Sequence, residues 1–172
     1  MALTKVLTGG IALDAVDNTI LKLDDDYALT GAVSGAGKIL QVVQVTFTTA
    51  VEITATSYTH YTAAATTITC SSTSSKVLVM LEANVTPWEN NNNDAQQKIR
   101  IYKGGSALSR ECTTRVYDYG GNGILSHLSA SINHLDSPSS TSELTYQLYH
   151  KLVAGDRAGV AGGSFTLIEI AG

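Results

Sequence analysis

The residues best suited to metal chemistry are scattered along the chain. Its four histidines are His60, His127, His134 and His150, and no two of them have the spacing of a known zinc site. We interpret each as a surface or interface residue. Three consecutive aspartates at residues 24–26 lack the alternating ligand positions, the central glycine and the terminal glutamate of a calcium loop. The sequence therefore predicts a solvated loop there and no bound metal.

Binding chemistry is concentrated in two polar loops. Trp88, the only tryptophan, lies just before four consecutive asparagines at residues 90–93. An exposed loop tryptophan often anchors a partner, and a lid over one end of a β-sandwich is the alternative. Tyr117 and Tyr119 flank Asp118, a pattern in which rings stack on sugars and the carboxylate accepts hydrogen bonds. Ordinary packing at a strand end is the alternative there. The candidate receptor-contact residues are Trp88, Asn91, Asn92, Tyr117, Asp118, Tyr119 and Asn122.

Catalytic signatures are absent from the sequence. It contains no GxSxG nucleophile elbow, no phosphate-binding loop and no HExxH motif. The glycines at residues 104–105 and 120–123 are turn residues, because no helical pattern follows either group. Cys70 and Cys112 lack CxxC spacing and are expected to be buried free thiols, with a disulfide left open. The sequence predicts no enzymatic activity and no cofactor.

Composition excludes two further classes of partner. The net charge is −4 and no basic run is present, so the electrostatic footprint of a nucleic-acid-binding protein is missing. No apolar stretch approaches the length of a membrane span, and residues 1–5 lack the apolar core of a signal peptide. We therefore expect the protein to be made and folded in a cytoplasm. Charged residues make up 15% of the chain against about 25% on average, which favours burial against other subunits.

The elements that would position these residues are short β-rich runs separated by glycine, serine, asparagine and threonine clusters. Residues 39–47 are apolar on both faces, which predicts a strand covered on both sides. Residues 76–85 form the most buried-looking strand. Residues 51–61 are expected to form a strand or a hairpin, and further strands are expected at residues 66–70, 95–102, 107–117, 124–135, 144–152 and 164–172. The fold is predicted to be all-β, a jelly-roll-like antiparallel β-sandwich.

The first 36 residues differ from the rest of the chain. Their apolar residues are interleaved with aspartate and asparagine and are too few for an independent core. We interpret residues 1–36 as a short N-terminal arm or attachment segment, joined through glycine-rich residues 31–37 to a sandwich domain at residues 37–172. The candidate assembly residues of this arm are Leu3, Val6, Ile11, Leu13, Ile20 and Leu23.

Several pieces of sequence, in their order along the chain, carry a family resemblance. They are KILQVVQ at residues 38–44, SSTSSKVLV at 71–79, IRIYKGG at 99–105, LDSP at 135–138, TY at 145–146 and TLIEIAG at 166–172. The opening MALTKV also fits. Together these pieces resemble a domain of tail-fibre and related virion proteins of tailed bacteriophages, especially aquatic ones. The resemblance implies a jelly-roll-like sandwich that forms homotrimers on the virion.

Two functions follow from that resemblance and from the arm. The first is host attachment as a tail fibre or fibre tip, with a host-surface glycan as the partner of the loops. The alternative is a capsid decoration protein that binds the shell through its N-terminal arm. Both predict a virion protein assembled in the host cytoplasm, whose partners are its own copies and other tail or capsid proteins.

Overall fold

The computed structural model describes residues 38–90, 94–117 and 123–172. The arm and its boundary at residue 36 lie outside this part and stay predictions. The same holds for several predicted site residues, which are Leu3, Val6, Ile11, Leu13, Ile20, Leu23, Asn91, Asn92, Asp118, Tyr119 and Asn122.

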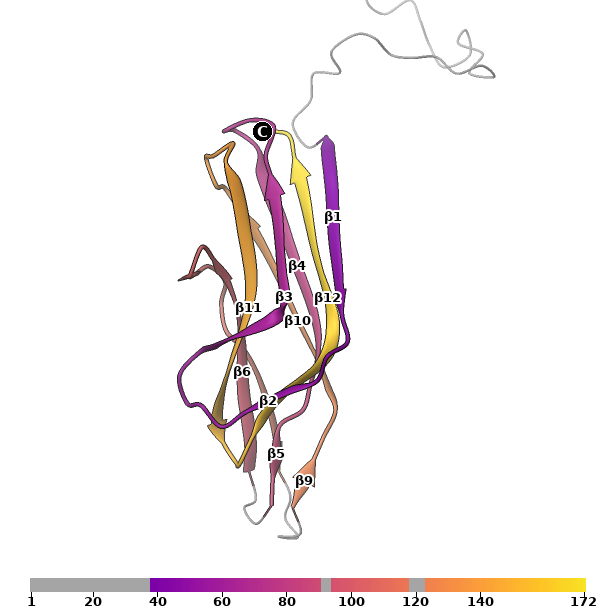
Figure 1. Ribbon diagram of the computed structural model, residues 1–172, viewed down its shortest axis with the longest axis vertical. Helices are drawn as coiled ribbons and strands as arrows, with labels where there is room; N and C mark the ends of the chain where they lie inside the picture. Colours follow the sequence, from indigo (N-terminus) through magenta and orange to yellow (C-terminus); the bar gives the residue numbers. More distant parts are fainter. Residues whose placement is uncertain (1–37, 91–93, 118–122) are drawn as a thin grey trace, which may run out of the picture. The chain divides into compact units, whose positions relative to one another are not determined.

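The described residues form twelve strands and no helix. The strands are β1 (Ile39–Phe47), β2 (Val51–Ile53), β3 (Thr59–Thr69), β4 (Lys76–Val85), β5 (Trp88–Glu89), β6 (Asp94–Lys103), β7 (Ser106–Ala107), β8 (Cys112–Tyr117), β9 (Ile124–Leu125), β10 (Leu128–Asp136), β11 (Glu143–Ala154) and β12 (Ala158–Ile170). Every pairing between them is antiparallel (Figure 1).

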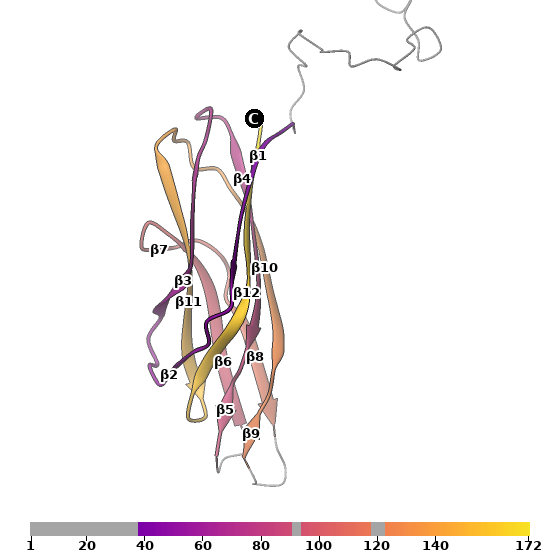
Figure 2. The same ribbon diagram turned by 45° about the vertical axis from the view of Figure 1, so that its right-hand side comes forward.

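Two five-stranded sheets face each other. Sheet A has the order β1-β12-β4-β10, and β2 adds to β12. Sheet B has the order β3-β11-β6, with β7 and β8 both pairing with β6. β5 and β9 form a separate two-stranded ribbon. Figure 2 shows the sheets as two layers, with β3 and β11 on one side and β1, β12 and β10 on the other.

The strand order is that of a jelly roll. In sheet A the first strand, β1, lies beside the last strand, β12, which in turn lies beside β4. In sheet B the penultimate strand, β11, lies between β3 and β6. Eight long strands arranged in this way, in two packed sheets, make the double Greek key of a jelly roll. The predicted all-β sandwich fold is confirmed.

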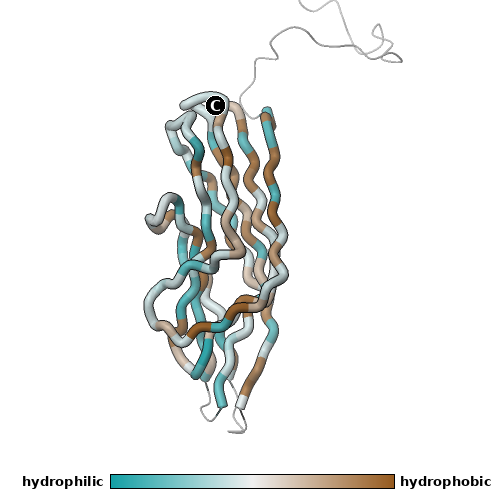
Figure 3. The backbone as a smooth tube through the Cα atoms, viewed as in Figure 1, coloured by the Kyte–Doolittle hydropathy of each residue, from teal (hydrophilic) through white to brown (hydrophobic). Residues whose placement is uncertain are grey.

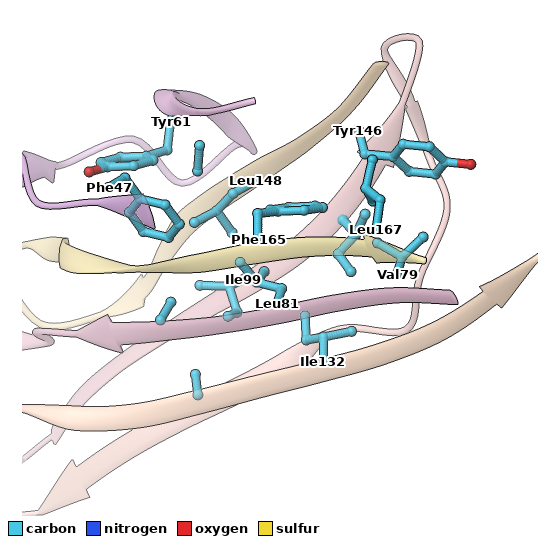
Figure 4. Close-up of a cluster of buried hydrophobic side chains, with 14 of the residues drawn as sticks. Phe47, Tyr61, Val79, Leu81, Ile99, Ile132, Tyr146, Leu148, Phe165 and Leu167 are labelled. Carbon is cyan, nitrogen blue, oxygen red and sulfur yellow. The ribbon is translucent and has the colours of Figure 1, made fainter. Parts of the chain in front are cut away.

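The core lies between the sheets and follows from alternation along the strands. In β4 every second side chain from Val77 to Val85 is buried, because successive residues of a strand point to opposite faces. Figure 4 shows side chains from both sheets meeting in this interior. The largest apolar ones include Phe47, Tyr61, Ile99, Tyr146, Leu148, Phe165 and Leu167.

Two buried polar groups tie the elements together. The Tyr146 hydroxyl donates to Asp136 Oδ2 at 2.8 Å, and Lys103 Nζ lies 2.7 Å from the same oxygen, so this carboxylate links β10 of sheet A to sheet B. In β12, the side chain of Glu169 is buried. It accepts hydrogen bonds from Gln41 Nε2 at 2.6 Å and from the backbone and side chain of Ser71 at 2.7 Å each.

The balance of forces on Glu169 lowers its pKa. Burial alone would raise the pKa of this carboxyl, because water no longer solvates the charged form. The hydrogen bonds from Gln41 and Ser71 favour the charged form more strongly and bring the pKa down from 4.5 to about 2. The ionised carboxylate therefore stabilises the junction of β1, β12 and the turn after β3.

One predicted feature of β1 is not seen within a single chain. The strand has the expected bounds, but cover on both sides is not found: Val42 is 58% exposed and Leu40 is 40% exposed. The physical reason is that β1 is an edge strand of sheet A, and no other described element packs on its outer face.

Several predicted strands also have different bounds. The run at residues 51–61 is divided into β2, which belongs to sheet A, and the start of β3, which belongs to sheet B. The chain crosses between the sheets there, so residues 51–61 form neither one continuous strand nor a hairpin. The run at residues 66–70 is the end of β3. The runs at 107–117 and 124–135 are likewise interrupted, each giving a two-residue strand and a longer one.

Glycine is required at one position in the middle of β12. Gly163 has a φ of 155° and lies against the neighbouring strands. A Cβ atom there would collide with the backbone carbonyl oxygen of Glu82 and would lie 2.8 Å from the ring of Phe47. The residue therefore permits close approach of β12 to β4 and β1.

Candidate functional site

The first candidate site is an apolar row across the outer face of sheet A. The strand registers place Val42 opposite Ile168, Ile168 opposite Leu78, and Leu78 opposite Leu135. We call these four residues the apolar row. It crosses all four main strands, and its ends, Val42 and Leu135, are 58% and 51% exposed. A continuous apolar strip on an outer face is typical of a protein interaction surface.

The edge strand extends this surface. β1 has the sequence ILQVVQVTF, without a charged residue or a proline. Ile39 and Leu40 are exposed beside the row, as is Met80 on β4. Figure 3 shows hydrophobic stretches along this strand. Exposed edge strands normally carry charges, prolines or bulges that block pairing with another chain. β1 has only an irregularity between Ile39 and Gln41, so most of its length is suited to a partner.

The outer face of sheet B has a different character. Tyr58, His60, Tyr102 and Tyr149 form a line of rings there. His60 and Tyr149 stack with ring centroids 5.1 Å apart, Tyr149 and Tyr102 stack at 3.9 Å, and Tyr102 meets Tyr58 in a tilted contact at 5.8 Å. Lys151 Nζ lies 4.6 Å from the centre of the Tyr58 ring. We call these residues, with Lys98, Arg100 and Glu111, the aromatic–cationic cluster.

Glu111 organises the charges of this cluster. It accepts hydrogen bonds from Lys98 Nζ at 2.6 Å and from the Tyr58 hydroxyl at 2.9 Å, and Lys151 Nζ lies 4.0 Å away. The hydrogen bond from Lys98 lowers the pKa of Glu111. Burial and the contact with Glu111 raise the pKa of Tyr58, and burial lowers that of His60. At neutral pH the Glu111 carboxyl is therefore ionised, and the Tyr58 phenol and the His60 ring are neutral.

The structure places Trp88 in β5, where it pairs with Leu125 of β9. Its backbone N–H donates to the carbonyl of Arg157 at 3.0 Å, and the Arg157 guanidinium lies 4.6 Å from the centre of its ring. Arg157 is held in turn by Glu52 at 2.8 Å. The half-buried ring is thus covered on one side by a fixed cation. A role as a receptor contact stays a prediction.

Tyr117 is the other receptor-contact candidate among the described residues. It ends β8, the residue is 51% exposed, and the Arg115 guanidinium lies 4.2 Å from the ring centre. Arg115 is itself fixed by Asp94 through two hydrogen bonds of 2.8 and 2.6 Å. Tyr117 therefore presents an exposed ring on a well-anchored strand end.

One histidine prediction is wrong. His150 on β11 is fully buried, and neither ring nitrogen has a hydrogen-bond partner. Alternation places it on the inner face with Tyr146 and Leu148, and this pattern outweighs the preference of a polar ring for the surface. Both cysteines are free thiols: Cys70 is buried and Cys112 is half-buried, and burial raises the pKa of each.

The described ranges contain no group of three or more His, Cys, Asp and Glu residues placed to hold a metal ion. Among the same residues, no helix has the length and apolar character needed to cross a membrane.

Comparisons with known proteins find partial structural similarity only. No family model matches the sequence, and no curated protein matches it significantly. A subviral particle of infectious bursal disease virus VP2 is 14% identical with a TM-score of 0.40, covering 74% of this chain and 32% of that chain. Eiger TNF from S. frugiperda is 9% identical with a TM-score of 0.34, and the match covers 72% of this chain and 92% of that chain. A structure of the Gx strain of infectious bursal disease virus is 15% identical to this chain with a TM-score of 0.34, and the match covers 80% of this chain and 33% of that chain. This chain thus spans about a third of each viral chain, and none of these similarities assigns it to a family.

Sequence reasoning missed both surfaces. The cluster does leave a local signal, because its members recur at every second position, as in Lys98, Arg100 and Tyr102 or in Tyr149 and Lys151. Such spacing places side chains on one face of a strand. The missing information is which strands are neighbours, and only the fold supplies it.

Proposed function

We propose that this protein is a non-enzymatic structural protein of a tailed-bacteriophage particle, a homotrimer that acts in host attachment as a tail fibre or fibre tip. The observation that carries the assembly part of this proposal is the apolar row. The family resemblance of the sequence supports the phage setting and the three-fold symmetry.

The apolar row costs free energy when it faces water. Fully burying one large aliphatic side chain is worth about 1.5–3 kcal/mol. The four residues of the row, together with Leu40 and Met80, offer several such gains on one continuous face. A second copy of the chain is the partner that fits best, because a nearly uncharged surface can meet an identical one without like-charge repulsion.

Most soluble homo-oligomers have closed point-group symmetry, and a head-to-tail contact between identical subunits closes into a ring, such as a trimer, when its rotation permits. In a trimer, the face of sheet A from each copy would turn toward the common axis, with β1 at the boundary between neighbours. The other sheet and the ends of the sandwich would remain on the outside. Repeated presentation of weak outer contacts then gives avidity for a host surface.

The experiment that tests this function is quantitative mass spectrometry of purified particles. A low copy number, in fixed ratio to known tail proteins, supports the tail fibre or tip. A high copy number in fixed ratio to the major capsid protein would instead identify a decoration protein. Absence of the protein from purified particles would overturn the virion assignment altogether.

A further inference from the structure

The rings of the aromatic–cationic cluster have little free face. Tyr149 lies between His60 and Tyr102, so both of its faces are covered. Tyr102 is flanked by Tyr149 and Tyr58, and Tyr58 carries the Lys151 ammonium. Stacking of a sugar ring on Tyr149 is therefore blocked. The half-buried rings offer their edges and hydroxyl groups instead.

Some hydrogen-bond donors of the cluster are not used by contacts within the cluster and are available to a ligand. Among the described residues, the hydroxyls of Tyr102 and Tyr149 make no hydrogen bond. Arg100 donates from Nε to the carbonyl of Ser109 at 2.7 Å, which fixes the guanidinium and leaves its two terminal nitrogens available. A fixed guanidinium with free nitrogens matches the geometry of a carboxylate or phosphate group.

The cluster is also a local centre of positive charge. Lys98 and Lys151 contact one carboxylate, Glu111, and Arg100 lies on the same face of β6 as Lys98, on a chain whose net charge is −4. The register places Lys98 directly opposite Lys151, an arrangement of like charges that is unfavourable in a sheet. Glu111 contacts both and offsets part of this repulsion. A bound anion would offset the rest.

We propose that the aromatic–cationic cluster binds an acidic polysaccharide, with Arg100, Tyr102 and Tyr149 contacting its carboxylate or phosphate groups. This inference deepens the attachment role proposed above and rests on it, because a trimer closed through sheet A leaves the outer face of sheet B free. The ligand chemistry follows from the donors and the charge. The stacked rings keep the donors in place before the ligand arrives, which reduces the entropy cost of binding.

The test is calorimetric titration of the full chain with three probes: polygalacturonate oligomers, a phosphomannan and neutral dextran. Binding of either acidic probe, weakened by added salt, supports the proposal, and the stronger one identifies the anionic group. Dextran should not bind. No binding of either acidic probe, or equal binding of dextran, would overturn it.

Variants separate the cluster from general charge effects. Arg100→Gln should weaken binding about ten- to a hundredfold, since a charge-assisted hydrogen bond is worth about 1.5–3 kcal/mol. The double variant Tyr102→Phe, Tyr149→Phe keeps the stack and removes both hydroxyls, so binding should fall while the fold is retained. Arg115→Gln, on β8 of the same sheet, makes the same change in charge and should leave binding nearly unchanged. Equal weakening by Arg100→Gln and Arg115→Gln would refute a specific site.

The oligomer mass measured on the same samples distinguishes the two proposals. A trimer that binds no acidic probe contradicts the polysaccharide site alone. A monomer that binds through Arg100 contradicts trimeric assembly and leaves the site in place. Circular dichroism of each variant confirms that a loss of binding is not a loss of fold.

Discussion

Acid should weaken this protein through one buried histidine. His150 lies on the inner face of β11, where neither ring nitrogen is hydrogen-bonded and its ring meets Tyr61 edge-on with centroids 6.1 Å apart. Desolvation disfavours the imidazolium and lowers the pKa of His150 from 6.5 to about 4. The folded state therefore keeps this ring neutral over a range in which the unfolded chain takes up a proton.

The sign and size of the effect follow from this difference in pKa. Above pH 6.5 both states are neutral at His150, and its protonation does not affect stability. As the pH falls from 6.5 toward 4, the unfolded state is favoured by its extra proton. At about 1.4 kcal/mol per pKa unit, the total loss is about 3 kcal/mol. Most of it occurs above pH 4.5, the ordinary pKa of a glutamate.

The assay is urea unfolding at fixed protein concentration across this pH range, comparing wild type with His150→Leu. Leucine has a similar volume and does not titrate, so the variant should lose most of the pH dependence. A smaller slope should remain, since burial also lowers the pKa of His60. His127→Leu, at an exposed position, is the control and should behave as wild type does. A His150→Leu variant with the wild-type pH dependence would show that protonation of His150 does not cause the acid destabilisation.

Three further predictions concern the folded chain. Wild type should lose stability as the pH falls from 4.5 to about 2, because the lowered pKa of Glu169 stabilises the folded state fully only above that range. Glu169→Gln should remove this loss. Acid unfolding followed by circular dichroism measures the pH dependence of both proteins. Tyr146→Phe deletes the buried hydrogen bond to Asp136 and should lower the free energy of unfolding by about 1.5–3 kcal/mol in urea, and an unchanged value contradicts a stabilising bond. Gly163→Ala should lower the Tm more than Gly104→Ala, since only the first adds a Cβ against neighbouring atoms, and equal Tm changes would contradict this.

Strand positions could be predicted well where alternation is strong. The run at residues 76–85 gave β4 with its full bounds, and the run at 39–47 gave β1. Both are long, rich in valine and leucine, and bounded by polar or small residues, which is the pattern of a pleated strand. The fold class followed from the repetition of such runs. Bounds failed where the chain leaves one sheet for the other, as it does after β2, because composition does not record a crossover.

The two surfaces depend on pairing between distant segments. Val42 and Ile168 are neighbours only because the first and last strands of a jelly roll lie side by side. Likewise Tyr102 and Tyr149 meet because β6 pairs with β11. Alternation predicts which side chains share the face of one strand, and it does not predict which strand comes next. For that reason the sequence pointed to the loops at Trp88 and 117–122 as contact sites, and the sheet faces emerged only from the fold.

The most direct test of the central claim is the mass of the protein in solution, measured by native mass spectrometry for wild type and Val42→Lys. We expect a wild-type particle of three 18.1 kDa chains and a monomeric Val42→Lys variant, because a lysine would be forced into the apolar interface. Thr113→Lys, on the exposed face of the other sheet, should remain trimeric. A monomeric wild type, or a Val42→Lys variant as trimeric as Thr113→Lys, would contradict assembly through sheet A.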